Sequence, residues 1–181
     1  MTRLMRAAMA ATGAGLALFL AGCATPADNR AMAVAAPAPS IRQHPYSVGV
    51  TTAGGAETSA LGSTNIGNPE LKAAIEKSIV DSRLFREVVQ GQGGEYRLSV
   101  TVVQISKPVF GFDFTVSMEA GWSLVRMRDN QVVLRKAITS SHTATMGDAF
   151  AGVRRLQLAV EGAARSNIEQ GLAAIAALDL T

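Results

Sequence analysis

Few residues of this sequence have the types and spacing that catalysis requires. Ser140 and Ser141 come directly before His142, and Asp148 follows in the same stretch, so a nucleophile, a base and an orienting acid stand close together. However, adjacent residues of a strand point to opposite faces, and the glycine-flanked turn that exposes a nucleophilic serine is missing. His44, the other histidine, lies in an Ala/Pro-rich stretch. We therefore predict no catalytic residue and expect a protein that is not an enzyme.

Cys23 has the most distinctive chemistry in the chain. It is the only cysteine among 181 residues, so it has no partner for an intrachain disulfide. No cluster of histidines and acidic residues has the spacing of a metal site. We predict neither a metal ion nor a dissociable cofactor.

The residues before Cys23 have the three parts of an export signal. Arg3 and Arg6 form a cationic start, and residues 7–21 form an uncharged apolar run. This run is shorter than the roughly 20 residues that a membrane-spanning helix needs. We predict a signal peptide over residues 1–22.

The end of this segment, Leu20-Ala21-Gly22-Cys23, resembles the lipobox of bacterial lipoproteins. The resemblance implies that Leu20, Ala21 and Gly22 are read by the lipoprotein signal peptidase. It also implies that the Cys23 thiol receives a diacylglyceryl group, that the chain is cut before Cys23 and that the new amine is acylated, commonly with palmitate. Such a protein is anchored to a membrane by its acyl chains. Its expected partners are the membrane and the lipoprotein processing and sorting machinery.

The residues that follow Cys23 bear on its destination. They are Ala24 and Thr25, with no aspartate, which resembles the default outer-membrane signal of Gram-negative sorting. We expect a periplasm-facing protein on the inner leaflet of the outer membrane.

The charge of the chain does not indicate a nucleic-acid partner. The precursor has 17 basic and 14 acidic side chains, and removal of the signal takes Arg3 and Arg6 with it. The mature chain is then nearly neutral, and it has no basic stripe with interleaved aromatic residues.

Composition divides the mature chain into two parts. Residues 23–46 are rich in alanine and proline with few large apolar side chains, which predicts a linker after the lipidated cysteine. Residues 47–181 are long enough for one domain with its own core.

Hydrophobic periodicity within residues 47–181 predicts a strand, a helix, four further strands and a long helix. This βαββββα order predicts an α+β two-layer sandwich, with one mostly antiparallel sheet of about five strands and two helices on one face. The expected strands are 47–51, 84–89, 95–107, 112–124 and 131–142, and the expected helices are 69–81 and 148–178.

The alternation of the strand over 95–107 breaks after Val102. Tyr96, Leu98 and Val100 share one phase, whereas Val103 and Ile105 take the other. The break predicts a β-bulge or a stretch buried on both faces.

The segment 107–112 is unusually apolar for the tip of a hairpin, since it contains Val109, Phe110 and Phe112. The interpretation that we favour is that Val109 and Phe110 fold back under the helices. The alternative is an exposed tip that contacts a membrane surface or another envelope protein.

The last helix has charged residues along one side. Arg154 and Arg155 are expected on a solvated face, and a docking face for a partner is the alternative. Glu161 and Arg165 have the spacing of an i, i+4 ion pair.

Residues 145–150, 155–156 and 161–168 resemble an uncharacterised family of proteobacterial lipoproteins. Some members of that family are labelled UDP-N-acetylglucosamine acyltransferase, but the enzyme of that name is a left-handed β-helix of hexapeptide repeats, and this sequence has no such repeat. In element order the chain is also similar to small envelope lipoproteins that assist lipid or lipopolysaccharide transport and to auxiliary subunits of ABC transporters.

These features together predict a membrane-anchored envelope lipoprotein with a binding or assembly role, accessory to envelope transport or maintenance. One alternative is a lipid carrier with an apolar cavity between helices and sheet. Another is an enzyme acting on envelope lipid or sugar, such as an acyltransferase.

Overall fold

The computed structural model describes residues 24–34, 42–59, 63–91 and 93–180. The elements follow in the order α1 (Asn29–Met32), β1 (His44–Ala53), α2 (Asn68–Ser82), β2 (Phe85–Val89), β3 (Tyr96–Ser106), β4 (Phe114–Arg126), β5 (Gln131–Ala144) and α3 (Gly152–Ala176). From β1 onward this is the predicted βαββββα order, and most bounds lie within a few residues of those predicted.

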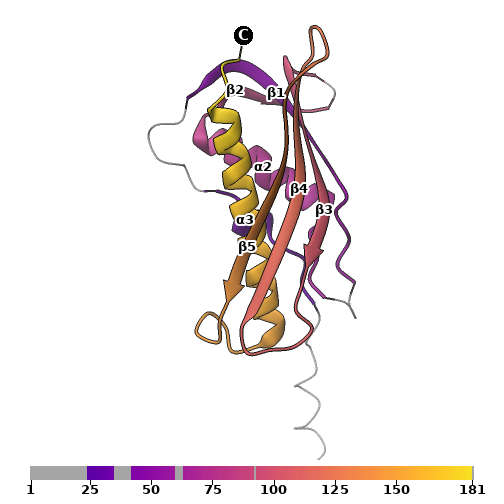
Figure 1. Ribbon diagram of the computed structural model, residues 1–181, viewed down its shortest axis with the longest axis vertical. Helices are drawn as coiled ribbons and strands as arrows, with labels where there is room; N and C mark the ends of the chain where they lie inside the picture. Colours follow the sequence, from indigo (N-terminus) through magenta and orange to yellow (C-terminus); the bar gives the residue numbers. More distant parts are fainter. Residues whose placement is uncertain (1–23, 35–41, 60–62, 92, 181) are drawn as a thin grey trace, which may run out of the picture.

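The five strands form one sheet in the order β2-β1-β3-β4-β5 (Figure 1). β1 pairs in parallel with both β2 and β3. α2 carries the chain from the end of β1 back to the level of its beginning, so β2 runs in the same direction as β1. β3, β4 and β5 form an antiparallel meander. The sheet is therefore mixed, with its parallel part at one side and its antiparallel part at the other.

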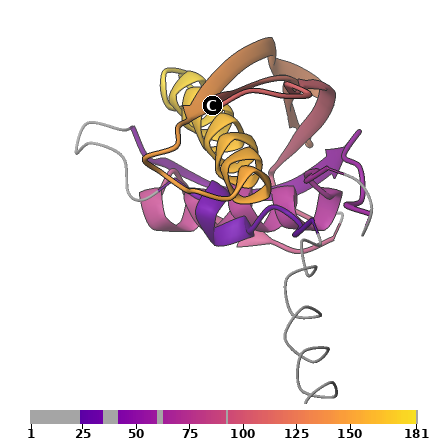
Figure 2. The same ribbon diagram turned by 90° about the horizontal axis from the view of Figure 1, so that it is seen from below.

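The helices cover one face of the sheet, so the predicted α+β two-layer class is confirmed. α3 lies along β4 and β5, and α2 packs on β1. Figure 2 shows that β4 and β5 curl over α3, which lies between them and the layer formed by α1 and α2. The curl follows from the strong twist that long antiparallel strands adopt.

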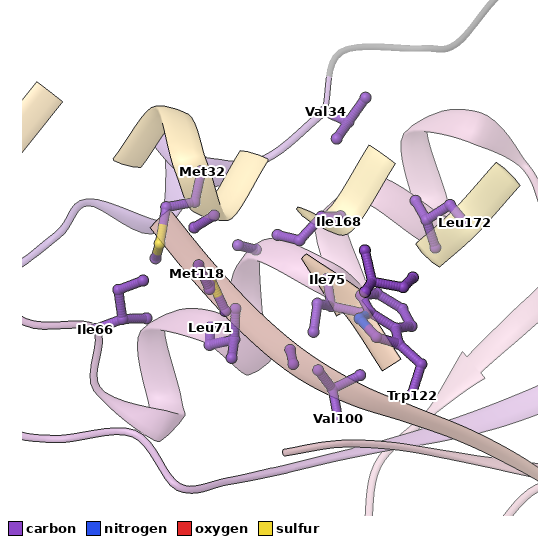
Figure 3. Packing of buried hydrophobic residues seen from close by; sticks show 14 of the residues in the cluster. Met32, Val34, Ile66, Leu71, Ile75, Val100, Met118, Trp122, Ile168 and Leu172 are labelled. Atoms are coloured by element: carbon purple, nitrogen blue, oxygen red, sulfur yellow. The ribbon is translucent and has the colours of Figure 1, made fainter. Parts of the chain in front are cut away.

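The core lies between this curled sheet and the helices (Figure 3). Trp122 of β4 is its largest side chain and is 1% exposed. The indole lies against Gly171 of α3, where a Cβ would come within 2.5 Å of the ring, and its Nε1 donates to Asn167 Oδ1 at 2.9 Å. Small residues therefore let α3 approach the sheet closely, and Asn167 satisfies the one polar atom of the indole.

The predicted irregularity in β3 is present as a bulge. The register with β4 shifts between Val102 and Gln104, and Val103 is exposed whereas Val102 is buried. The inserted residue explains why the apolar alternation changes phase at this point.

The prediction of a linker over residues 23–46 is wrong for its described part. Residues 29–32 form α1, Met32 is fully buried, and the Val34 amide donates to Ser78 Oγ of α2. His44 is not in a linker either, because β1 begins there and the side chain is 3% exposed. The segment has few large apolar side chains, but Met32 and Val34 are enough to dock it between α2 and α3.

None of the helices in the described residues is both long and apolar enough to cross a membrane.

Candidate functional site

The predicted signal peptide and lipobox, with Leu20, Ala21, Gly22 and Cys23, lie outside the described residues. The structure begins at Ala24, the residue after the cysteine. It therefore shows how the chain next to the expected lipid is held by the domain.

That chain is fixed to α3 by a buried carboxylate. Glu161 is 1% exposed, and its Oε1 accepts hydrogen bonds from the Asp28 amide and from Gln157 Nε2, both at 3.0 Å. The same Gln157 nitrogen donates to Pro26 O at 3.2 Å. Two adjacent turns of α3 thus hold the residues that follow Cys23.

Two further contacts extend this attachment. Arg165 donates through Nε to Ala31 O at 2.7 Å, and Thr64 Oγ1 donates to Thr25 O at 3.0 Å. Glu161 and Arg165 therefore each bind the N-terminal segment and do not form the expected ion pair with each other. We call residues 25–34 the anchor segment.

The loop between β3 and β4 is exposed, so the favoured interpretation of segment 107–112 is wrong. Val109, Phe110 and Phe112 are 92%, 87% and 78% exposed. Gly111 between the two phenylalanines has φ 145°, a conformation in which a side chain would be strained. The three apolar side chains therefore project from the domain and take no part in its core.

Lys107 attaches the base of this loop to residues 63–65, of which Thr64 is bonded to Thr25 of the anchor segment. Its Nζ donates to Ser63 Oγ at 2.8 Å, to Thr64 O at 3.0 Å and to Asn65 Oδ1 at 2.5 Å. Burial among these groups lowers the pKa of the Lys107 ammonium. Three oxygen acceptors nevertheless match the three donors of the charged form.

A second apolar loop, residues 145–151, connects β5 to α3. Phe150 is 89% exposed and Met146 is 45% exposed. Asp148 Oδ2 accepts from the Thr145 amide at 2.7 Å and from Thr145 Oγ1 at 2.9 Å, and these bonds hold the pKa of Asp148 below its usual range. The carboxylate therefore stabilises the turn from which Phe150 projects.

Arg155 has a different position from the one predicted, because it is buried and not on a solvated face. Its Nη1 donates to Ala149 O at 2.8 Å and to Phe150 O, and its guanidinium lies 5.3 Å from the centre of the Phe114 ring. The residue thus connects the second loop to the start of β4. Arg154 is exposed, as expected, and donates to Gln157 Oε1.

No protein-family model matches the sequence, and no curated protein matches it. The fold itself is known from solved structures. The protein XCC0632 of Xanthomonas campestris, of family DUF330, is 15% identical, with 77% of this chain and 91% of that chain covered and a TM-score of 0.56. A subunit of the PelC dodecamer from Paraburkholderia phytofirmans is 17% identical, with 81% of this chain and 95% of that chain covered and a TM-score of 0.51.

A candidate lipoprotein from Caulobacter crescentus is 18% identical over 70% of this chain and 87% of its own, with a TM-score of 0.48. The first two likenesses, at 15% and 17% identity, show that the fold is shared.

The structure does not assemble the hydrolase-like grouping of Ser140, Ser141, His142 and Asp148. Ser140 is buried and donates to Ala163 O at 2.8 Å, whereas Ser141 and His142 are exposed. The hydroxyl therefore stabilises the contact between β5 and α3, and the Asp148 carboxylate is bonded to Thr145. The expectation that the chain is not an enzyme stays a prediction.

Metal-ligating residues do not converge in the part of the chain that the structure describes. His44 binds a backbone carbonyl, with its Nε2 3.1 Å from Ile175 O of α3. Its burial lowers the pKa of the imidazole. The neutral ring is the form that fits this site, with the proton on Nε2 as donor.

Sequence reasoning missed Glu161, Gln157 and Phe150. Glu161 carries a signal that can be recognised afterwards, since it lies between Val160 and Gly162-Ala163-Ala164 on the face of α3 that packs inward. An acid at such a position needs a buried partner. Phe150, two residues after Asp148, gave no pattern because a single apolar residue in a loop has no periodicity.

Proposed function

We propose that the chain is an envelope lipoprotein, acylated at Cys23, whose domain is held close to the membrane and acts in binding or assembly. Its role would be accessory to a transport or maintenance system of the envelope. The resemblance of residues 20–23 to a lipobox supports the anchor, and the residues after Cys23 support the inner leaflet of the outer membrane.

The observation that carries the proposal is the anchor segment. Pro26 O, the Asp28 amide and Ala31 O are each bonded to α3, although α3 is the last element of the chain. A chain start that only carried a signal for export would need no such contacts. A domain that must keep a defined position relative to its lipid does need them.

A binding role suits the distribution of polar groups better than an enzymatic role. The buried polar residues Glu161, Asn167, Ser140 and His44 are each engaged with protein atoms. The acyltransferase label of the similar family is not supported by this two-layer fold, because the enzyme of that name is a β-helix.

A lipid carrier is the less favoured alternative. It requires an apolar cavity between helices and sheet, and the indole of Trp122 occupies this region together with Ile168 and Leu172 (Figure 3). A dense interior of this kind leaves binding to the surface of the domain.

The test is purification of the tagged protein from membranes of a producing bacterium, with mass spectrometry of the Cys23 peptide and of co-purifying proteins. Cys23→Ala is the control. We expect an acylated Cys23, membrane recovery that is lost in the control, and envelope proteins in stoichiometric amounts. An unmodified Cys23 would contradict the anchor, and an acylated protein recovered alone would contradict the assembly role.

A further inference from the structure

The exposed apolar side chains of the domain are concentrated in its two neighbouring loops. Nine large apolar side chains are exposed in the described residues, and five of them belong to the two loops; a sixth, Val153, lies in the first turn of α3 directly after the second loop. The three most exposed are Val109, Phe150 and Phe110. A soluble surface rarely presents several aromatic side chains in one place without a use for them.

The two loops are held side by side. Phe114, at the end of the first loop, pairs across the sheet with Ala144, which precedes the second. Arg155 places its guanidinium over the Phe114 ring and donates to Ala149 O and Phe150 O of the second loop. Both loops therefore project from the same end of the molecule, at the bottom of Figure 1.

The start of the anchor segment is connected to the first loop through Thr64 and to the helix that follows the second loop through Gln157. Thr25 O accepts from Thr64 Oγ1, and Thr64 O accepts from Lys107 Nζ, two residues before Val109. On the other side, Pro26 O accepts from Gln157 in the second turn of α3, which follows Phe150 closely. Cys23 is two residues before Thr25, and two residues of extended chain span at most about 7 Å.

We propose that Val109, Phe110, Phe112 and Phe150 insert into the same lipid leaflet that receives the acyl chains of Cys23. This inference rests on the proposed function, because the anchor is what brings this end of the domain to a membrane. The lipid and the two loops then form three points of contact. Three points define a plane, so the domain stands on the bilayer in one orientation.

A lipid surface fits these loops better than a protein partner does. The loops flank the attachment point, so a protein bound to them would have to lie between the domain and its own anchor. Aromatic side chains are favoured at the boundary between acyl chains and headgroups. Lys107 and Asp148 are bonded to protein atoms at the loop bases. Asp113 follows Phe112 directly and is exposed, so under this proposal it remains among the headgroups while the apolar tips enter first.

The test places a tryptophan at each tip of the acylated protein. The variants Phe110→Trp and Phe150→Trp are purified and reconstituted into vesicles of phosphatidylethanolamine and phosphatidylglycerol, with or without bromine on the acyl chains. Val80→Trp is the matched control, because Val80 is 60% exposed on α2, away from both loops. The unsubstituted protein gives the contribution of the buried Trp122. Flotation shows that each protein is bound to the vesicles.

We expect brominated lipid to remove most of the added emission at positions 110 and 150 and to leave that at position 80 unchanged. The added emission at the tips should also shift to the blue in vesicles. A floated protein with acylated Cys23 and unquenched tips would overturn the loop proposal alone. A protein without acyl groups would overturn both proposals, and mass spectrometry of the same samples separates the two cases.

Discussion

The two turns that flank β4 differ in the polarity of their side chains. At one end of this strand, Val109, Phe110 and Phe112 project into solvent. At the other end, the turn contains Asp129, which accepts from Arg126 and from the Gln131 amide. The thirteen residues of β4 hold the two turns about 40 Å apart.

The turn between β4 and β5 is stabilised by hydrogen bonds within its own hairpin. Asp129 is bonded within its own hairpin, and the hydrogen bond from the Arg126 guanidinium lowers the pKa of its carboxyl. Asn130 adopts a positive φ of 56°, which asparagine tolerates well. The side chains at the tip of the other turn are apolar and can make no such bonds. The turn at one end of β4 is satisfied by hydrogen bonds within the hairpin, whereas the turn at the other end exposes apolar side chains that would be buried only by the proposed membrane contact.

The strand between the two turns should give the largest effect. Trp122→Ala removes the indole that lies between β4 and α3, and we expect a loss of about 3 to 5 kcal/mol in the free energy of unfolding. Urea unfolding followed by circular dichroism measures it. Trp122→Phe loses the bond to Asn167 but keeps most of the side-chain volume, so it should cost clearly less. Equal losses would show that the indole volume is not what joins the layers.

The next effect concerns the attachment of the chain start near the apolar turn. Glu161→Ala leaves the Asp28 amide and Gln157 without their buried acceptor, and we expect a loss of about 1 to 3 kcal/mol. Limited proteolysis should then cut within residues 25–34, which the parent protein protects. Glu161→Gln retains an acceptor oxygen and should remain protected. Rapid cleavage of the parent itself would refute a docked anchor segment.

A smaller effect should arise at the opposite end of α3, where His44 meets Ile175. Burial lowers the pKa of His44, so the unfolded chain binds the proton more readily than the folded one. The contribution to stability is complete above about pH 6.5 and is lost as the pH falls below it, by at most about 1.4 kcal/mol per pH unit.

His44→Gln is the control for this pH dependence, because its amide can donate to the same carbonyl without titrating. Thermal unfolding between pH 7.5 and 5.5 gives the comparison. An identical decline in both proteins would assign the effect to other groups.

The smallest effect is expected at the apolar turn itself. Phe110→Ser should change the free energy of unfolding by no more than about 0.5 kcal/mol, because the side chain is 87% exposed. Chemical denaturation of the soluble domain measures it. A loss comparable with that of Trp122→Ala would mean that the turn packs on the domain, and the contrast between the two ends of β4 would disappear.

The sequence was sufficient to predict the fold because its periodicities are strong and local. The alternation in β3 and β4, the Pro69 start of α2 and the repeat of α3 each define an element without tertiary information. Parallel pairing of β1 with β3 could not be predicted in this way. It depends on which side of β1 the chain reaches after the crossover through α2 and after β2, and no local pattern encodes that choice.

The candidate site was harder to predict because burial there depends on distant partners. Met32 and Val34 stand in an alanine-rich stretch that resembles a linker, and they are buried only because α2 and α3 meet them. Phe110 has a side chain typical of a core residue, but it lies in a loop where it is exposed to solvent. The number of large apolar residues in a segment therefore predicted the wrong burial in both places.

The docking of the anchor segment on α3 has a consequence for the order of events during biosynthesis. If the chain is exported and processed as proposed, residues 25–34 would leave the translocation channel early, whereas Gln157, Glu161 and Arg165, to which they bind, would leave it late. Until then the segment would have no helix to bind, so the bond before Cys23 would stay accessible to a processing enzyme. Under the proposed attachment, the long sequence separation of these contacts delays docking of residues 25–34, so that acylation and cleavage precede folding.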